Sequence, residues 1–196
     1  MRKKLLVFDT ESTGKPDWPA PSGMSHQPHI VQLAIGVYDY ETLEQLELFE
    51  MFARPDEWSA AETIQYHGFT DDYLTSHGVA EEDLYLEFKL RVLTGDYAEI
   101  VGHSVDFDFR MMRIAAYRFE NEAEANKLRG FLKPLKYCTG RNSKPIMGVT
   151  GRAMPKLVEA YKHFTGEDFL HNHNALHDVQ ATFAVYKGIR EHNNQG

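Results

Sequence analysis

Apolar and polar positions divide the chain into a run of strands followed by alternating helices and strands. A nearly continuous apolar run predicts a buried first strand within Lys4–Gly14, and a second run predicts a strand at Ile30–Tyr38. Leu43–Phe52 contains alternating apolar and polar residues and predicts a third strand, with Asp39–Thr42 as the hairpin turn before it. Residues 15–29 contain four prolines and therefore predict a long loop after the first strand.

Helical spacing follows Pro55. Ser59 and Glu62 have the spacing of a capping box and predict one helix start, and Thr70–Tyr73 predicts another. Apolar spacing predicts an amphipathic helix from about residue 80 to residue 93. The remaining predicted elements are a strand at 98–102, helices at 106–119 and 121–132, a short strand at 135–138, a polar loop at 140–151, and helices at 154–164 and 174–191. This order predicts an α/β fold, with a three-strand antiparallel meander in a mixed sheet flanked by helices.

The composition is that of an ordinary soluble globular protein. The chain has 196 residues, of which 42% are hydrophobic and 26% charged, so one domain is expected. No apolar run approaches the ~20 residues of a membrane span, and the single cysteine, Cys138, fits a cytoplasmic location. The net charge of −8 lacks the basic character of tight nucleic-acid binders, so any contact with nucleic acid must be local.

Two carboxylates, Asp9 and Glu11, stand at the far end of the first strand. Residues two apart on a strand point to the same face, so both acids project into one place. Like charges held together and half-buried cost free energy unless a cation lies between them, and oxygen ligands suit Mg²⁺ or Mn²⁺. An acidic turn after an edge strand is the alternative interpretation, and this stretch alone does not distinguish the two.

Three stretches are informative together: Val7–Gly14, Val101–Phe109 at a strand-to-helix junction, and His173–Asp178 at the start of the final helix. They resemble the three motifs of the DEDD exonucleases, in the subgroup with a histidine, whose best-known member is the proofreading epsilon subunit of DNA polymerase III. The resemblance includes Tyr66–Thr70 and Met154–Tyr161 and so covers nearly the whole chain. It implies a ribonuclease H-like fold and one exonuclease domain over residues 1–192, with a short tail at 193–196.

The resemblance also implies a set of catalytic residues. They are Asp9, Glu11, Asp108, His173 and Asp178. Asp108 is assigned rather than Asp106 because the family's acid follows an aromatic residue, and Asp106 fits the role of an acid at a helix N-terminus. The four acids would bind two divalent cations, Mg²⁺ or Mn²⁺, which in such sites lie about 3.5–4 Å apart and assist both the attacking and the departing oxygen. His173 would be the general base, since the ordinary pKa of histidine is about 6.5.

Residues expected to contact the substrate surround these positions. They are Thr10, Ser12, His67, His103, Ser104 and Phe107. Ser12 and Ser104 depart from the threonine and asparagine more usual in the family, and Ser104 alters a hydrogen bond on the substrate side. Phe107 has core packing as its default role, and its ring is also suited to stack on the terminal base.

Three functions are compatible with the sequence. The favoured one is a metal-dependent 3′–5′ exonuclease that releases nucleoside 5′-monophosphates from a single-stranded or frayed DNA end. An RNA-trimming enzyme of the same family is the second, because no motif reads the 2′-hydroxyl. A non-catalytic binding module is the third, although four unneutralised buried carboxylates would destabilise it. Polymerase association, a free-standing enzyme and a homodimer are all open, and the 15–29 loop is expected to restrict access to single strands.

Overall fold

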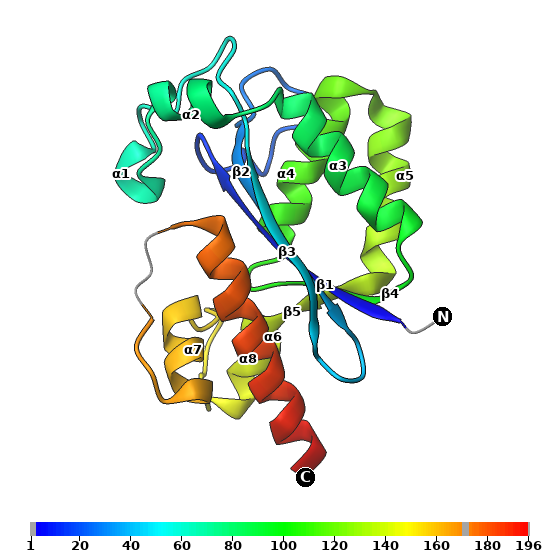
Figure 1. Ribbon diagram of the computed structural model, residues 1–196, viewed down its shortest axis with the longest axis vertical. Helices are drawn as coiled ribbons and strands as arrows, with labels where there is room; N and C mark the ends of the chain where they lie inside the picture. Colours follow the sequence, from blue (N-terminus) through cyan, green and yellow to red (C-terminus); the bar gives the residue numbers. More distant parts are fainter. Residues whose placement is uncertain (1–2, 170–172, 196) are drawn as a thin grey trace.

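A five-stranded mixed sheet forms the centre of the protein, for which a computed structural model describes residues 3–169 and 173–195. The strands are β1 (Lys4–Ser12), β2 (Ile30–Asp39), β3 (Gln45–Phe52), β4 (Tyr97–Gly102) and β5 (Lys136–Cys138). They lie in the order β3-β2-β1-β4-β5 (Figure 1). β3, β2 and β1 pair antiparallel, whereas β4 runs parallel to β1 and β5 parallel to β4. The predicted meander within a mixed sheet is confirmed.

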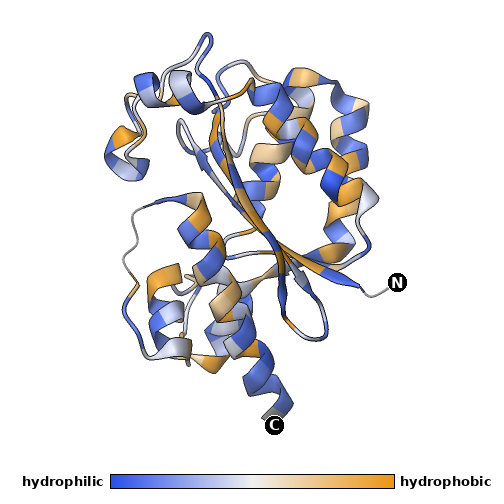
Figure 2. Ribbon diagram, viewed as in Figure 1, coloured by the Kyte–Doolittle hydropathy of each residue, from blue (hydrophilic) through white to orange (hydrophobic). Residues whose placement is uncertain are grey.

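Helices cover both faces of this sheet. They are α1 (Ile64–His67), α2 (Asp71–His77), α3 (Glu81–Thr94), α4 (Asp106–Phe119), α5 (Glu122–Leu132), α6 (Thr139–Ile146), α7 (Leu157–Thr165) and α8 (Ala175–Gln195), with a 3₁₀ turn at Lys133–Leu135. One group contains α3, α4 and α5, and the other contains α8 with α6 and α7 packed against it (Figure 1). Apolar residues concentrate in the strands, whereas the last turns of α8 are polar (Figure 2). No helix within the described ranges combines the length and hydropathy that crossing a membrane requires.

The central strand β1 is buried on both faces because its apolar side chains alternate between two cores. Leu6 and Phe8 pack into the cluster that includes α3 and α4, whereas Leu5 and Val7 pack into the cluster that includes α8. A strand covered on both sides has a continuous apolar run in its sequence, which is why it was recognisable. Hydrogen bonding to β2 and β4 holds β1 in place, and its carboxyl end carries the predicted acids.

The predicted helix start at Ser59 is wrong. α1 begins only at Ile64, after Thr63, and the Ser59 hydroxyl instead donates to Asp71 Oδ2 at 2.5 Å. Asp71 also accepts the backbone N–H of Ala60 at 2.8 Å. This segment is therefore tied to α2 by tertiary hydrogen bonds, which override the local capping pattern.

The predicted polar loop at 140–151 is also wrong in its first half, where α6 lies. Gly140 permits a close approach to the residue that follows β4: a Cβ there would lie 2.7 Å from the carbonyl oxygen of His103, which accepts the Gly140 N–H at 3.1 Å. Ser143 is buried in the same helix, and Pro145 lies in its last turn, where the helix ends. Glycine here provides close packing rather than a break.

The last two helices differ from prediction at their ends. α7 begins at Leu157 rather than residue 154, because Pro155 disfavours helical geometry at the residue before it. α8 runs to Gln195 rather than to Glu191.

Candidate active site

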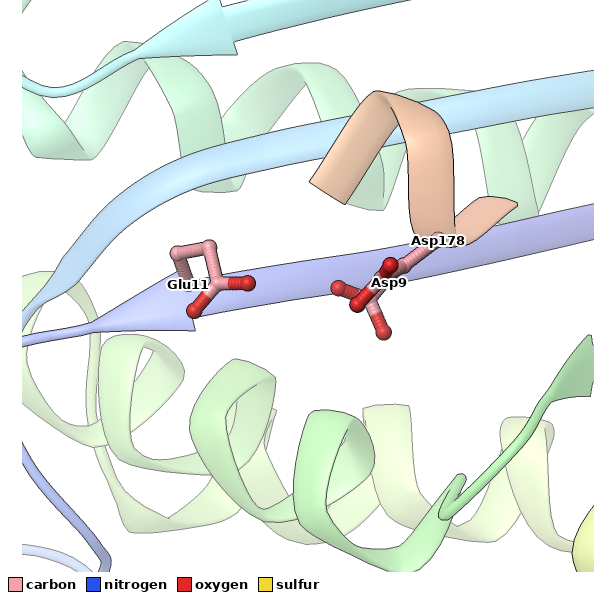
Figure 3. A group of neighbouring side chains, drawn as sticks. All are labelled: Asp9, Glu11 and Asp178. Atoms are coloured by element: carbon pink, nitrogen blue, oxygen red, sulfur yellow. The ribbon is translucent and has the colours of Figure 1, made fainter. Parts of the chain in front are cut away.

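Three carboxylates from two elements meet at the carboxyl end of β1. Asp9 and Glu11 project from β1, and Asp178 reaches them from the first turns of α8 (Figure 3). One carboxylate oxygen from each residue lies within 4.8 Å of the others. Asp9 and Glu11 share a face of β1, as their spacing of two residues predicts.

Asp108 reaches the same pocket from the first turn of α4. Its Oδ1 accepts the backbone N–H of Thr10 at 3.0 Å and the Thr10 hydroxyl at 2.8 Å, and the side chain is buried. Thr10 points to the face of β1 that α4 covers, opposite its two acidic neighbours. Asp106 instead pairs with Lys136 at 2.6 Å and with Arg141 at 2.5 Å. The structure therefore brings Asp108, and not Asp106, into the pocket.

Burial and crowding raise the pKa values of Asp9, Glu11 and Asp108. Burial raises the pKa of Asp9 well above its ordinary value, and Asp108, Asp178 and Glu11 add repulsion in that order. Burial, and then Asp178 and Asp108, raise the pKa of Glu11 to about 9. Burial raises the pKa of Asp108 to about 7, although the hydrogen bonds from Thr10 lower it. Oxygen ligands with unneutralised negative charge fit Mg²⁺ or Mn²⁺, so the donor set fits a divalent metal site.

The N-terminus of α8 is held by a side-chain cap. Asn174 Oδ1 accepts the backbone N–H of Leu176 at 3.0 Å and of His177 at 3.2 Å, and its carbonyl accepts the N–H of Asp178 at 2.9 Å. These bonds are those of an N-cap residue, and they determine where the helix starts. The start in turn determines the direction in which Asp178 points.

Gln32 on β2 connects α8 to the sheet. It is fully buried opposite Glu11 in the strand pairing, and its Oε1 accepts the backbone N–H of Ala175 at 2.9 Å. Its Nε2 donates to Glu50 Oε2 at 2.6 Å. This positioning residue was not predicted from the sequence, where its signal is a glutamine inside an otherwise apolar buried strand.

His173 lies just before α8, facing α1 across the pocket. Its backbone has φ of 47°, and its ring meets that of Tyr66 edge-on, with centroids 6.1 Å apart. His67 is buried, donates from Nε2 to Thr63 Oγ1 at 2.9 Å and accepts the N–H of Phe69 on Nδ1 at 3.1 Å. Burial and the nearby His173 lower the pKa of His67, so its neutral form is favoured.

All the predicted site residues line one pocket of about 940 Å³. They are Asp9, Thr10, Glu11, Ser12, His67, His103, Ser104, Phe107, Asp108, His173 and Asp178. Lys15, Lys156 and Tyr66 line it as well, and none of the three was predicted as a site residue. Tyr66 and Lys156 lie in the stretches Tyr66–Thr70 and Met154–Tyr161 of the family resemblance, whereas Lys15 lies in a loop without a motif.

Four of the six residues expected to contact substrate already hydrogen-bond within the protein: Thr10 and His67, as described above, and also His103 and Ser12. His103 Nε2 donates to the carbonyl of Pro155 at 2.9 Å, and its Nδ1 lies 3.0 Å from Thr139 Oγ1. The Ser12 hydroxyl donates to the carbonyl of Gly14 at 2.8 Å. Ser104, by contrast, is exposed at the pocket wall.

Residues 6–186 match the family model RNase_T, described as exonuclease. The chain belongs to this family. It is accordingly a DEDD-type 3′–5′ exonuclease domain with the ribonuclease H-like fold. Its resemblance to the epsilon subunit in particular stays a prediction.

Solved exonuclease I structures have the same fold as this family member. E. coli exonuclease I in complex with a dT13 oligonucleotide is 16% identical, with a TM-score of 0.76 over 98% of this chain and 42% of that chain. The zinc-bound form of the E. coli enzyme with single-stranded DNA is 17% identical, with a TM-score of 0.73 over 100% and 42%. A moderately thermophilic exonuclease I from Methylocaldum szegediense is 20% identical, with a TM-score of 0.71 over 98% and 41%. The chain thus spans well under half the length of these relatives, and no curated protein matches it.

Proposed function

We propose that the protein is a metal-dependent 3′–5′ exonuclease that removes nucleoside 5′-monophosphates from the 3′ end of single-stranded DNA. The observation that carries this proposal is the meeting of Asp9, Glu11 and Asp178 within 4.8 Å, in a chain of the exonuclease family. Asp108 adds a fourth acid in the same pocket. A site with so much negative charge at its centre is suited to bind cations before it binds a polyanion.

The four acids would hold two divalent cations, Mg²⁺ or Mn²⁺. Such ions supply Lewis-acid stabilisation of a phosphodiester and of its departing oxygen. The chain's own contribution is to hold the carboxylates in place. Thr10 orients Asp108 through two hydrogen bonds, and the capped N-terminus of α8 orients Asp178.

His173 is the proposed general base, taking a proton from the attacking water. It lines the pocket with the acids, and histidine exchanges protons near neutral pH. Tyr66 packs edge-on against its ring. Burial lowers the pKa of His67, which favours its neutral form beside His173.

Contacts to the substrate would come from the pocket wall. Ser104 is exposed and suited to hydrogen-bond a nucleotide, and Phe107 offers a ring for stacking. Lys15 and Lys156 supply positive charge for phosphates. His103 is better suited to shape the wall, because both its ring nitrogens lie within hydrogen-bonding distance of protein atoms.

DNA is the proposed polymer because the exonuclease I structures that share this fold contain dT13 and dA16 oligonucleotides. A cytoplasmic location is proposed because the one cysteine, Cys138, is a buried free thiol.

Digestion of a 5′-labelled oligonucleotide tests the function. With Mg²⁺, the wild type should shorten dT12 one nucleotide at a time from the 3′ end and release dTMP, with slower digestion of a matched rU12. EDTA should stop the reaction. Asp9→Asn and Asp178→Asn should each lower the rate about 1,000-fold or more, and His173→Gln about 100-fold or more.

Asp56→Asn is the matched control, because Asp56 is an exposed aspartate outside the pocket. It should digest dT12 at the wild-type rate. Undiminished digestion by Asp9→Asn or Asp178→Asn would refute the assignment of the metal site. Faster digestion of rU12 than of dT12 would establish the RNA-trimming function instead.

A further inference from the structure

We propose that the 15–29 loop, together with the adjoining surface of α4, forms a second nucleic-acid contact that binds the single strand upstream of the 3′ end. This inference rests on the proposed function and adds a binding surface outside the catalytic centre. Trp18 would stack on a base, and Lys15 and Arg110 would contact phosphates. We call these three residues the upstream surface.

The loop that carries Trp18 is held in one conformation from within. Gln27 is buried at its centre, where its Oε1 accepts the N–H of Asp17 at 3.1 Å. Its Nε2 donates to the carbonyl of Asp17 at 2.9 Å and to that of Pro21 at 3.1 Å. Ordering a loop of this length costs conformational entropy, which these bonds and the prolines offset.

Helix α4 fastens the loop from outside through two arginines. Arg110 donates to the carbonyl of Asp17 at 3.1 Å, and Arg118 donates to the carbonyls of Gln27 and Pro28 at 2.9 Å and 3.1 Å. Figure 1 shows the loop after β1 beside this helix. Trp18 therefore lies on a loop that hydrogen bonds hold in one conformation.

Trp18 is 53% exposed on this loop, and the Arg110 guanidinium lies 5.9 Å from the centre of its ring. A single exposed apolar side chain is ordinary on a protein surface and carries no argument alone. A rigidly held tryptophan beside an arginine, however, is the combination on which single-stranded nucleic acids stack without sequence preference.

The upstream surface is continuous with the catalytic pocket in two ways. Lys15, three residues before Trp18, lines the pocket itself. Phe107 also lines it, and Arg110 lies one turn further along the same face of α4. A strand that leaves the pocket along this wall therefore meets Arg110 within about one helical turn, roughly 5 Å of rise, and the Trp18 ring lies 5.9 Å from the Arg110 guanidinium.

The distribution of charge also favours a single-stranded nucleic acid as the partner of this surface. The protein has a net charge of −8, and four acids line the pocket, so a polyanion needs local cations on its way in. Arg110 and Arg113 stand three residues apart on α4, where like charges repel, and a phosphate would relieve this repulsion. Asp17, the acid within the loop, pairs with His26 at 3.0 Å.

Tryptophan fluorescence tests direct binding, because Trp18 and Trp58 are the two tryptophans of the chain. Trp58 stacks on His29 and is replaced by phenylalanine, which leaves Trp18 as the one reporter. Asp178→Asn prevents digestion in this background. Titration with dT12 should quench Trp18 to a saturating level, whereas dT3, which leaves fewer nucleotides outside the pocket, should quench it less.

Steady-state kinetics with otherwise wild-type protein provide the second readout. Trp18→Ala should raise KM for dT12 about 10-fold or more, the effect of losing one base stack, with kcat for dT3 unchanged. Trp18→Phe should restore most of the affinity. Phe131→Ala is the matched control, since Phe131 is an exposed aromatic residue on α5.

An unchanged KM for dT12 in Trp18→Ala, or an equal rise for dT3 and dT12, would overturn the inference while leaving the proposed function intact. Unresponsive Trp18 fluorescence would do the same. A wild type that digests neither oligonucleotide would instead refute the proposed function, and the fluorescence titration would still report on the upstream surface.

Discussion

Replacing Asp9 with asparagine should stabilise the metal-free protein at neutral pH. Asp9, Glu11 and Asp178 place carboxylate oxygens within 4.8 Å of one another, and asparagine keeps the shape while removing one charge. Two unit charges at this distance repel by about 3.5 kcal/mol at an effective dielectric constant of about 20.

Protonation limits this repulsion but has a cost of its own, which can be worked out at Glu11. The pKa of Glu11 is raised from 4.5 to about 9, so at pH 7 the folded protein holds a proton there that the unfolded chain has lost. Keeping that proton costs about 1.4 kcal/mol per pH unit above 4.5, or about 3.4 kcal/mol at pH 7. Burial is the largest cause of this shift, followed by Asp178 and Asp108, so this figure belongs to Glu11 and is not added to the repulsion that Asp9→Asn removes. After allowance for solvent at the pocket mouth, we expect Asp9→Asn to gain about 2–3 kcal/mol.

The pH dependence has a definite sign. When the pKa of a carboxyl group is higher in the folded state, the unfolded state binds fewer protons than the folded state at any pH above the unfolded pKa. The stability of the metal-free wild type should therefore fall as pH rises from about 4.5 toward 9. The slope should be shallower in Asp9→Asn, because the remaining acids repel one another less.

Thermal unfolding followed by circular dichroism in EDTA at pH 5, 7 and 8.5 measures this effect. For a chain of 196 residues, the expected gain raises Tm at pH 7 by about 4–12 °C. The exposed Asp56→Asn should leave Tm unchanged, and Mg²⁺ should raise Tm in the wild type more than in Asp9→Asn. An Asp9→Asn variant with a lower Tm at every pH, or a wild type that becomes more stable between pH 5 and 8.5, would refute the reasoning.

Three further predictions concern residues that support the site. Gln32→Leu leaves buried polar groups unpaired, so it should lower stability by about 1–3 kcal/mol in urea unfolding and reduce kcat more than it raises KM. Asn174→Ala removes the α8 cap and should lower stability by about 1 kcal/mol in the same measurement. Both Gln32→Leu and Asn174→Ala should lower stability more than the surface variant Lys162→Gln does. Lys15→Gln and Lys156→Gln should each reduce the slope of log KM against log salt by about 0.7, as expected for one lost phosphate contact on a single strand, whereas Lys162→Gln should leave this slope unchanged.

Local patterns identified the central part of the fold because its elements are determined locally. The apolar run of β1 and the two-residue spacing of Asp9 and Glu11 depend on neighbouring residues alone. The missed helix α6 depends on contacts that form only after folding, such as the packing of Gly140 against the carbonyl of His103. Ser59 has the local pattern of a helix cap, but its hydroxyl hydrogen-bonds to Asp71 at the start of α2 instead of capping a helix.

The site shows the same division between local and distant determinants. The motifs located the acids and His173, since each lies in a short stretch with a characteristic order. Gln32 was missed because its partner, Ala175, lies 143 residues further along the chain. Lys15 was missed because its position at the pocket follows from the path of the chain and from no pattern in the sequence. Lys156 lies in Met154–Tyr161, a stretch that resembles the family but from which no site residue was predicted.

The two faces of β1 have different tasks in this site, and the alternation of the strand separates them. Asp9 and Glu11 point toward the layer of α8, where Asp178 meets them, while Thr10 between them points toward α4 and holds Asp108. One strand thereby collects acids from both helical layers of the fold. A shift of β1 by a single residue would exchange the two faces, turning Asp9 and Glu11 away from Asp178 and Thr10 away from Asp108. The buried alternation of Leu5 to Phe8 therefore supports the acid cluster as well as the core. The repulsion among these acids is a stability cost that the two cores of the sheet must offset, and the cations proposed to bind there would relieve it.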